Sequence, residues 1–352
     1  MGTNASNPLK SIKAKRVILP ALIGLGVVVL LFYREFDPEV FNKLSFTWMS
    51  AVWLFVALLC MVGRDFGYMI RIRVLSDWKL TWIQAFRIIM IWEFTSAVTP
   101  GSVGGTSVAT LFVHKEGISV GRSSAIVMVT SALDELYFVL MFPLLLLFVG
   151  QESLFAIPDS PGWTHGLLVV ALIGFSIKLI WVLALLYGLF INPRGLGKLV
   201  YKIFHLPGLR RWKRAAGKAA LDIITSAKEM KAKKLKYWIN ALLSTFLSWS
   251  SRYWVVNFMF LAFFAVNDHF LIFARQLVMS IILLVSPTPG GSGVAEFTFD
   301  IFLGDFIPLE LAGFAIALAF LWRIISYYPY LIVGTILVPK WLNDKFASSK
   351  KI

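Results

Sequence analysis

Ionisable side chains lie inside long apolar runs of this sequence. An ionisable group within a membrane-spanning segment is unfavourable unless it is paired or hydrated, so each one is a candidate functional residue. Arg64 and Arg87 lie nearer to one end of their runs. Lys178 lies in the middle of a run outside the repeats, and we assign this residue no role. The other deep positions are Glu93, Asp134, Glu135, Arg252, Arg275, Glu296 and Arg323.

Three of the arginines, Arg64, Arg252 and Arg275, could converge on one anionic head group. The planar guanidinium of arginine donates two parallel hydrogen bonds to a phosphate, so arginine suits this role. Glu296 could balance one of these charges or take up a proton. The alternatives are internal ion pairs and side chains that extend to the membrane interface.

Asp134 and Arg323 occupy matching positions with opposite charge. Asp134 follows Pro100 by 34 residues, and Arg323 follows Pro289 by 34 residues. We expect these two side chains to pair across the molecule. Such a pair could be purely structural, or it could couple transport to a conformational change.

Two further apolar stretches, 80–113 and 270–303, are interrupted by proline and glycine. A helix does not readily continue through such a segment, and unpaired backbone at membrane depth needs surrounding protein or water. We therefore expect two re-entrant hairpins. Free N–H groups at helix ends favour anions, although the glycines could serve the turn alone. The predicted binding residues at the tips are Pro100, Gly101, Gly104, Pro289, Gly290, Gly291 and Gly293.

The composition indicates a membrane protein. Hydrophobic residues make up 58% of 352 and charged residues 15%, whereas a soluble domain carries roughly a quarter charged residues. The apolar runs reach the length of about 20 residues that crosses a bilayer as helix, and the alternation of a β-barrel strand is absent. We expect an all-α integral membrane protein with six spans, at 17–33, 46–70, 123–149, 165–191, 237–266 and 309–338.

Basic residues predict the orientation in the cell membrane. The tail 1–16 has four Lys and Arg and no acid, and the loop 193–236 has 13 of the 34 Lys and Arg. Arg71, Arg73 and Lys79 follow the second span, and four lysines lie in the C-terminal tail, 339–352. Because cytoplasmic loops are enriched in Lys and Arg, both termini are expected in the cytoplasm, with the loop on an anionic leaflet. No nucleic-acid recognition motif accompanies this charge.

The two interrupted stretches also belong to an internal repeat. The tripeptide Thr-Pro-Gly occurs at both tips, and two arginines 23 residues apart precede each tip. The repeat units are 46–149 and 237–338. The predicted topology opens the first hairpin to the cytoplasm and the second to the outside, the inverted arrangement of many secondary transporters. The alternative is a chance match between spans of similar composition.

The second tip, residues 287–296, resembles the signature of the flippase-like family, the transmembrane region of lysylphosphatidylglycerol synthases and its stand-alone relatives. The first tip, 100–105, is similar to that signature too. The last span shares Arg323, Tyr327, Tyr328, Pro329 and Gly334 with the family. The resemblance covers about residues 15–340, hence the expected domain 17–338. It implies a lipid translocase, and it does not imply aminoacyl transfer.

The function expected from these features is translocation of an anionic phospholipid or a lipid-linked phosphate between leaflets. One alternative is a non-transporting membrane subunit that docks an envelope or lipid-synthesis enzyme through the basic loop. Another is a membrane enzyme. Charge inside the spans favours a transporter over a scaffold. Because the four histidines show no metal-ligand spacing and no catalytic triad can be assembled, we expect no catalytic residue, metal or cofactor.

Overall fold

The computed structural model describes five stretches of the chain, and their regular secondary structure is helical: 46–99, 103–156, 161–203, 213–283 and 294–347. The predicted span 17–33 and the tail 1–16 lie outside the described residues. Four described helices are long and apolar enough to cross a membrane: Trp48–Leu75, Val120–Val149, His165–Ile191 and Ala315–Lys345. The expected all-α membrane fold is therefore confirmed.

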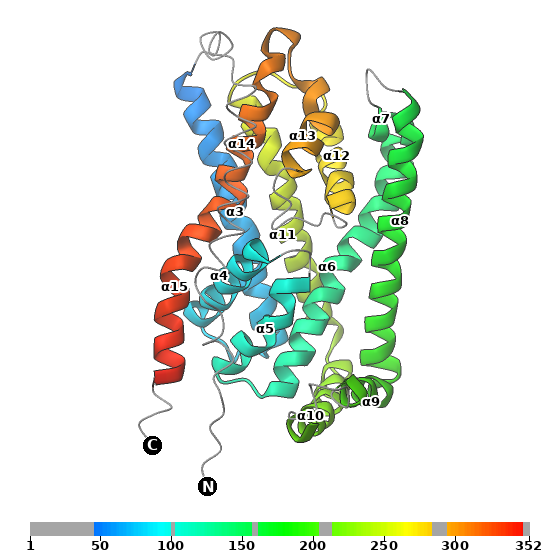
Figure 1. Cartoon of the computed structure of the whole chain (residues 1–352), viewed down its shortest axis with the longest axis vertical. Coiled ribbons are helices and arrows are strands. Elements are labelled where there is room, and N and C mark those ends of the chain that lie inside the picture. Colours follow the sequence, from blue (N-terminus) through cyan, green and yellow to red (C-terminus); the bar gives the residue numbers. More distant parts are fainter. Residues whose placement is uncertain (1–45, 100–102, 157–160, 204–212, 284–293, 348–352) are drawn as a thin grey trace.

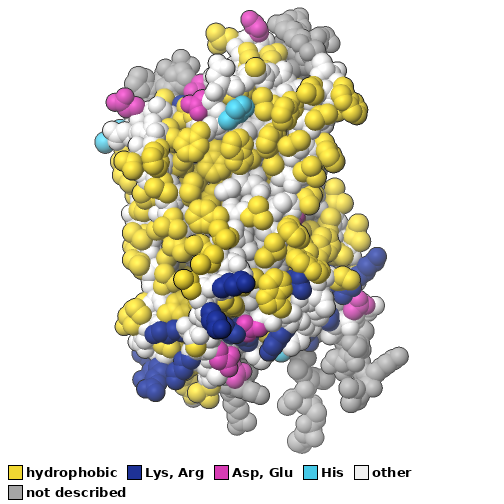
Figure 2. Space-filling view, turned by 180° about the vertical axis from the view of Figure 1, so that it is seen from behind, with side chains coloured by type: hydrophobic (Ala, Val, Ile, Leu, Met, Phe, Trp, Pro, Cys, Tyr) yellow, Lys and Arg dark blue, Asp and Glu magenta, His cyan; other side chains and the backbone are white. Residues whose placement is uncertain are grey.

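Long helices form the frame of the bundle (Figure 1). They are α3 (Trp48–Leu75), α6 (Val120–Val149), α8 (Pro161–Leu186) and α11 (Leu235–Leu261). Hydrophobic side chains cover much of the flank of the molecule (Figure 2), and among them Leu147 and Phe148 are 75% and 73% exposed. Large apolar groups on the outside suit a surface that faces lipid rather than water.

Helices α3 and α11 pack against each other at short distance. A Cβ atom at Gly67 would lie 2.8 Å from the carbonyl oxygen of Ser244, so a larger residue cannot replace this glycine without a shift. Ser248 donates a hydrogen bond to the carbonyl oxygen of Arg64 at 2.9 Å. Small residues let helices approach closely in membranes. Here the close approach brings the polar side chains of α3 and α11 toward one interior space.

Both interrupted stretches form pairs of short helices. The first pair is α4 (Trp82–Val98) and α5 (Val103–Lys115), and the second is α12 (His269–Ile282) and α13 (Val294–Leu303). Helix α4 ends at Val98, next to the predicted interruption. Figure 1 shows α4 and α5 in the lower half of the bundle and α12 and α13 in the upper half. A long helix followed by a pair of short helices thus occurs twice, with α6 after the first pair and the α14–α15 segment after the second.

The last predicted span, 309–338, is not one continuous helix. It comprises η6 (Leu309–Phe314), α14 (Ala315–Ser326) and α15 (Tyr328–Ala347). The backbone leaves the helical region at Tyr327, where φ is −131° and ψ is −54°. Pro329 accounts for the break, because its nitrogen cannot donate the next helical hydrogen bond.

The described residues of the segment 193–236, which the sequence pattern predicts to be a loop, include two helices. They are α9 (Pro193–Ile203) and α10 (Lys213–Lys231), and α8 reaches them through a π-helical turn, η2 (Tyr187–Ile191). Two short elements, α7 (Gln151–Phe155) and η5 (Gly304–Phe306), complete the order. Figure 1 places α9 and α10 at the lower end of the bundle, and Figure 2 shows Lys and Arg side chains gathered toward the same end.

Candidate functional site

A cavity of about 750 Å³ lies in the middle of the helix bundle. Residues from α3, α4, α6, α8, α11, α12, α13, α14 and α15 line it. Five basic side chains and three acidic side chains form its charged lining: Arg64, Arg71, Lys178, Arg252 and Arg323, with Glu93, Asp134 and Glu135. The lining therefore carries two more positive than negative formal charges.

Arg64 links three parts of the cavity wall. One of its guanidinium nitrogens lies 2.6 Å from Glu93 on α4, and the other lies 2.8 Å from Asp65. The second nitrogen also donates to the hydroxyl of Tyr330 on α15, at 2.8 Å. Arg64 is 2% exposed, so it is an interior group and does not extend to the membrane interface. Its pairing with Glu93 ties the first helix pair to α3.

Asp134 pairs with Arg71, and the expected pair between Asp134 and Arg323 is wrong. Both guanidinium nitrogens of Arg71 donate to the carboxylate, at 2.6 and 3.0 Å, and the indole of Trp249 adds a third hydrogen bond at 2.7 Å. Helix α3 continues to Leu75, so Arg71 lies in the helix interior two turns after Arg64 and is 3% exposed. Sequence reasoning had placed Arg71 on the cytoplasmic side of the span.

Arg323 pairs with Glu296 on the second helix pair. The two side chains are 3.0 Å apart, and both are almost completely buried. The guanidinium of Arg323 also lies 4.0 Å from the ring centre of Tyr327, at the break between α14 and α15. Each helix pair is thus joined to a neighbouring long helix by one buried arginine–glutamate pair.

Lys178 and Glu135 join α8 to α6 across the cavity wall. The ammonium nitrogen lies 2.5 Å from the carboxylate and 4.1 Å from the ring centre of Phe138. Lys178 is 5% exposed. The sequence analysis assigns Lys178 no role, and the structure supplies its partner, which lies 43 residues away on another helix.

Arg252 differs from the other cavity arginines. Within the described part of the chain, Arg64, Arg71 and Arg323 each form a salt bridge, whereas Arg252 forms none. Its guanidinium lies 5.9 Å from the ring centre of Trp249. Two more polar groups of the cavity, Nε of Arg64 and Oγ1 of Thr130, are buried and have no hydrogen-bond partner among the described residues. Of these three groups, the guanidinium of Arg252 is the one available to a bound anion, because the other two atoms are enclosed by protein.

Comparison with known proteins places this bundle in a family. Residues 17–334 match the family described as the lysylphosphatidylglycerol synthase TM region. The chain belongs to this family. The resemblance found at the second tip and the last span is thereby confirmed. A UPF0104 membrane protein of Archaeoglobus fulgidus is 25% identical over 347 residues, which cover 94% of this chain and 98% of the relative. No solved structure matches the chain.

In this member of the lysylphosphatidylglycerol synthase TM region family, Arg275 lies away from the central cavity. Its guanidinium binds the carboxylate of Asp305 at 2.7 Å and the carbonyl oxygens of Ser153 and Phe302 at 2.9 and 3.1 Å. The structure therefore does not bring Arg275 together with Arg64 and Arg252. Its acceptors come from α7, α13 and η5, so its observed role is to join three chain segments at one end of the bundle.

The predicted tip residues of both helix pairs fall almost wholly outside the described part of the chain. They are Pro100, Gly101, Pro289, Gly290, Gly291 and Gly293. Gly104 is the second residue of α5. The next residue, Gly105, would place a Cβ atom within 2.9 Å of the backbone nitrogen of Ser96, so the two arms of this pair touch.

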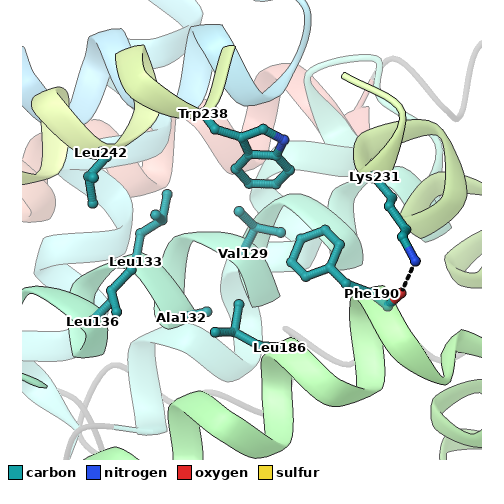
Figure 3. Close-up of a pocket in the computed structure, with 9 residues that line it drawn as sticks. All are labelled: Val129, Ala132, Leu133, Leu136, Leu186, Phe190, Lys231, Trp238 and Leu242. Carbon is teal, nitrogen blue, oxygen red and sulfur yellow. Dashed lines mark hydrogen bonds between the residues drawn. The ribbon is translucent and has the colours of Figure 1, made fainter. Parts of the chain in front are cut away.

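A second pocket, of about 390 Å³, is apolar (Figure 3). Its lining from α6 includes Val129 and Leu133, which lie on the opposite face of that helix from the cavity residues. The only charged side chain drawn there is Lys231, whose Nζ donates to the carbonyl oxygen of Phe190 at 2.8 Å. This lining suits a hydrocarbon chain and provides little that could hold a head group.

Among the described residues no cluster of His, Cys, Asp and Glu could hold a metal ion.

Proposed function

We propose that this protein moves an anionic phospholipid or a lipid-linked phosphate between membrane leaflets, with the head group held in the central cavity. One observation carries the proposal: Arg252 lines that cavity and forms no salt bridge with any described residue. A phosphate would provide the missing negative charge and several acceptors. Arg64 and Thr130 line the same cavity, and each has one enclosed donor without a hydrogen-bond partner among the described residues.

Several features support a lipid rather than a soluble anion as the substrate. The cavity lies within a bundle of helices that can cross a membrane, and its wall combines charged groups with apolar ones such as Ile177 and Ile180. A lipid presents both kinds of surface in one molecule. The name of the family refers to the synthase of a phospholipid, which agrees with this choice.

The transport mechanism that we propose is alternating access by two inverted repeats, 46–149 and 237–338. Helices α4 and α5 lie in one half of the bundle and α12 and α13 in the other, as expected of hairpins that enter from opposite sides (Figure 1). Arg64–Glu93 holds the first pair and Arg323–Glu296 holds the second. A phosphate that competes with Glu93 for Arg64 would loosen the first pair on binding.

We further propose that the protein lies in the cell membrane with both termini in the cytoplasm. Helices α9 and α10 would then rest on the anionic inner leaflet, because their lysines attract its surface charge. In this orientation α4 and α5 close the cytoplasmic side of the cavity, and α12 and α13 close the outer side.

The test is leaflet exchange of labelled lipids in proteoliposomes. Anionic and zwitterionic phospholipids with the same acyl chains are compared, together with a lipid-linked phosphate. We expect protein-dependent exchange of an anionic lipid, which should be recovered chemically unchanged. Chemical conversion of the lipid would indicate an enzyme. No exchange with any lipid would contradict the proposal and favour a subunit that docks a synthesis enzyme.

A further inference from the structure

The wall of the central cavity is open on one side, at α8. Trp181 and Ile180 of α8 line the cavity, yet they are 50% and 67% exposed. On the opposite wall, Arg64 and Arg323 are 2% and 5% exposed. Helix α8 lies at the edge of the bundle beside α6 (Figure 1), so this part of the cavity borders the outer surface along the α6–α8 seam.

Among the described residues, two polar contacts hold α8 against α6 at this seam. The outer contact is a hydrogen bond of 3.3 Å from the indole nitrogen of Trp181 to the hydroxyl of Ser131. The inner contact is the pair of Lys178 with Glu135, one helical turn away and nearly buried. A single long hydrogen bond between neutral groups contributes little to stability, so the outer contact can open at small cost.

The order of side chains across the seam matches the order of groups in a phospholipid. Apolar groups, including Ile177 and Ile180, face outward, and the buried Lys178, paired with Glu135, lies one helical turn from Trp181 on α8. A phosphate that passes the seam would therefore meet the Lys178–Glu135 pair first, and beyond it a cavity whose lining carries two more positive than negative charges. Acyl chains would stay against the apolar outer face and need not enter the polar cavity.

We infer that the α6–α8 seam is a lateral entrance for the lipid, with Trp181 and Ser131 as its gate. This inference rests on the proposed function, because it supplies the route by which a head group reaches the cavity. The head group passes between the two side chains while the acyl chains remain in the bilayer. Opening separates α8 from α6 at Trp181 and leaves α3 and α11 packed together.

The entrance can be locked with a reversible crosslink. In a Cys60→Ser background, Ser131→Cys and Trp181→Cys are joined by a short bis-methanethiosulfonate reagent, which a reducing agent cleaves. The matched control joins Trp53→Cys and Phe258→Cys, at a ring stack between α3 and α11 that does not line the cavity. Two readouts are taken: leaflet exchange, and labelling of the protein by a phospholipid with a photoactivatable head group, with the labelled residues mapped by mass spectrometry.

We expect the gate crosslink to abolish exchange and labelling of cavity residues, reduction to restore both, and the control crosslink to change neither. Labelling of the cavity that persists in the locked protein would overturn the entrance, whatever the exchange rate. Failure of the translocase proposal itself looks different, because wild-type protein would then exchange no lipid.

A second experiment needs no crosslink. Trp181→Ala should speed lipid exchange roughly two- to tenfold, the range given by loss of one neutral hydrogen bond. Trp254→Ala, a partly exposed tryptophan outside the cavity, should leave the rate unchanged, and an unchanged rate in Trp181→Ala would argue against the gate.

Discussion

At the scale of single residues, arginines that already have a carboxylate partner differ from the one that has none. The first kind is structural, and the second kind is a candidate binding group. Arg71 and Arg323 lie on the cavity, yet each is already held by a carboxylate, at 2.6 and 3.0 Å. Arg252 lies on the same cavity without such a partner among the described residues. A charge with no internal partner is the one that a ligand can satisfy without breaking an existing pair.

Arg252→Gln should therefore slow leaflet exchange about tenfold or more, because loss of a hydrogen bond to a charged group costs roughly 1.5–3 kcal/mol. Arg252→Lys should recover part of the rate, since it keeps the charge and loses the planar fork. Exchange of the same anionic lipid in proteoliposomes measures both. Arg87→Gln is the matched control, because Arg87 is a half-buried arginine that does not line the cavity. Equal rates for wild type and Arg252→Gln would remove Arg252 from the site.

Arg275→Gln should act on stability instead. The substitution removes the partner of Asp305 and two hydrogen bonds to the carbonyl oxygens of Ser153 and Phe302. Breaking a buried ion pair costs about 3–5 kcal/mol, and the lower end applies because a quarter of the Asp305 side chain is exposed to water. We expect a lower temperature of thermal unfolding in detergent, and an exchange rate per folded molecule close to wild type. An exchange defect at unchanged thermal stability would return Arg275 to the binding site.

At the scale of elements, α4 is held tightly against α15. A Cβ atom at Gly334 would lie 2.2 Å from ring carbons of Phe94, and the hydroxyl of Tyr327 donates to the carbonyl oxygen of Ala97 at 2.9 Å. Because the helix breaks at Tyr327, the last span presents Arg323 and Tyr330 to the cavity from two separate helices, α14 and α15.

Gly334→Ala should destabilise the protein by about 1–3 kcal/mol, because the new methyl group overlaps the ring of Phe94 and forces a shift. Thermal unfolding measures the effect, and Phe94→Ala in the same chain should relieve it. Gly166→Ala on α8 is the control, since a Cβ atom there meets no atom within 4 Å. That control should be neutral or slightly stabilising, because alanine favours helix over glycine. Equal losses at both glycines would contradict close packing of α4 on α15.

At the scale of the whole molecule, the clustering of Lys and Arg at one end predicts the orientation. Single cysteines replace Gln151, at the start of α7, and Thr225, on α10, in a Cys60→Ser background. Both positions are exposed. A thiol reagent that cannot cross membranes, applied to intact cells, should label position 151 and leave position 225 unlabelled until the cells are opened. The reverse pattern would invert the topology and assign the basic helices to the outer face.

The sequence by itself determined the class of fold and the positions of most helix breaks. Runs of apolar residues predict spans because the bilayer fixes their length, and proline with glycine predicts interruptions because these residues act on their own backbone. The break at Tyr327 was missed, although Pro329 was a local signal for it. The helices of the segment 193–236 were missed as well, because the Lys and Arg residues there were used only to predict the orientation in the membrane.

Only the tertiary structure decided which charged residues share a site. Arg71 was assigned to a loop, but α3 extends past it and turns it toward Asp134. Arg275 and Arg252 both lie within apolar runs of the sequence, yet Asp305 satisfies the first and no described carboxylate satisfies the second. The physical reason is that helical periodicity fixes the face on which a side chain lies. The partner on the facing helix depends on the rotation, tilt and vertical offset of that helix, which packing across the bundle sets.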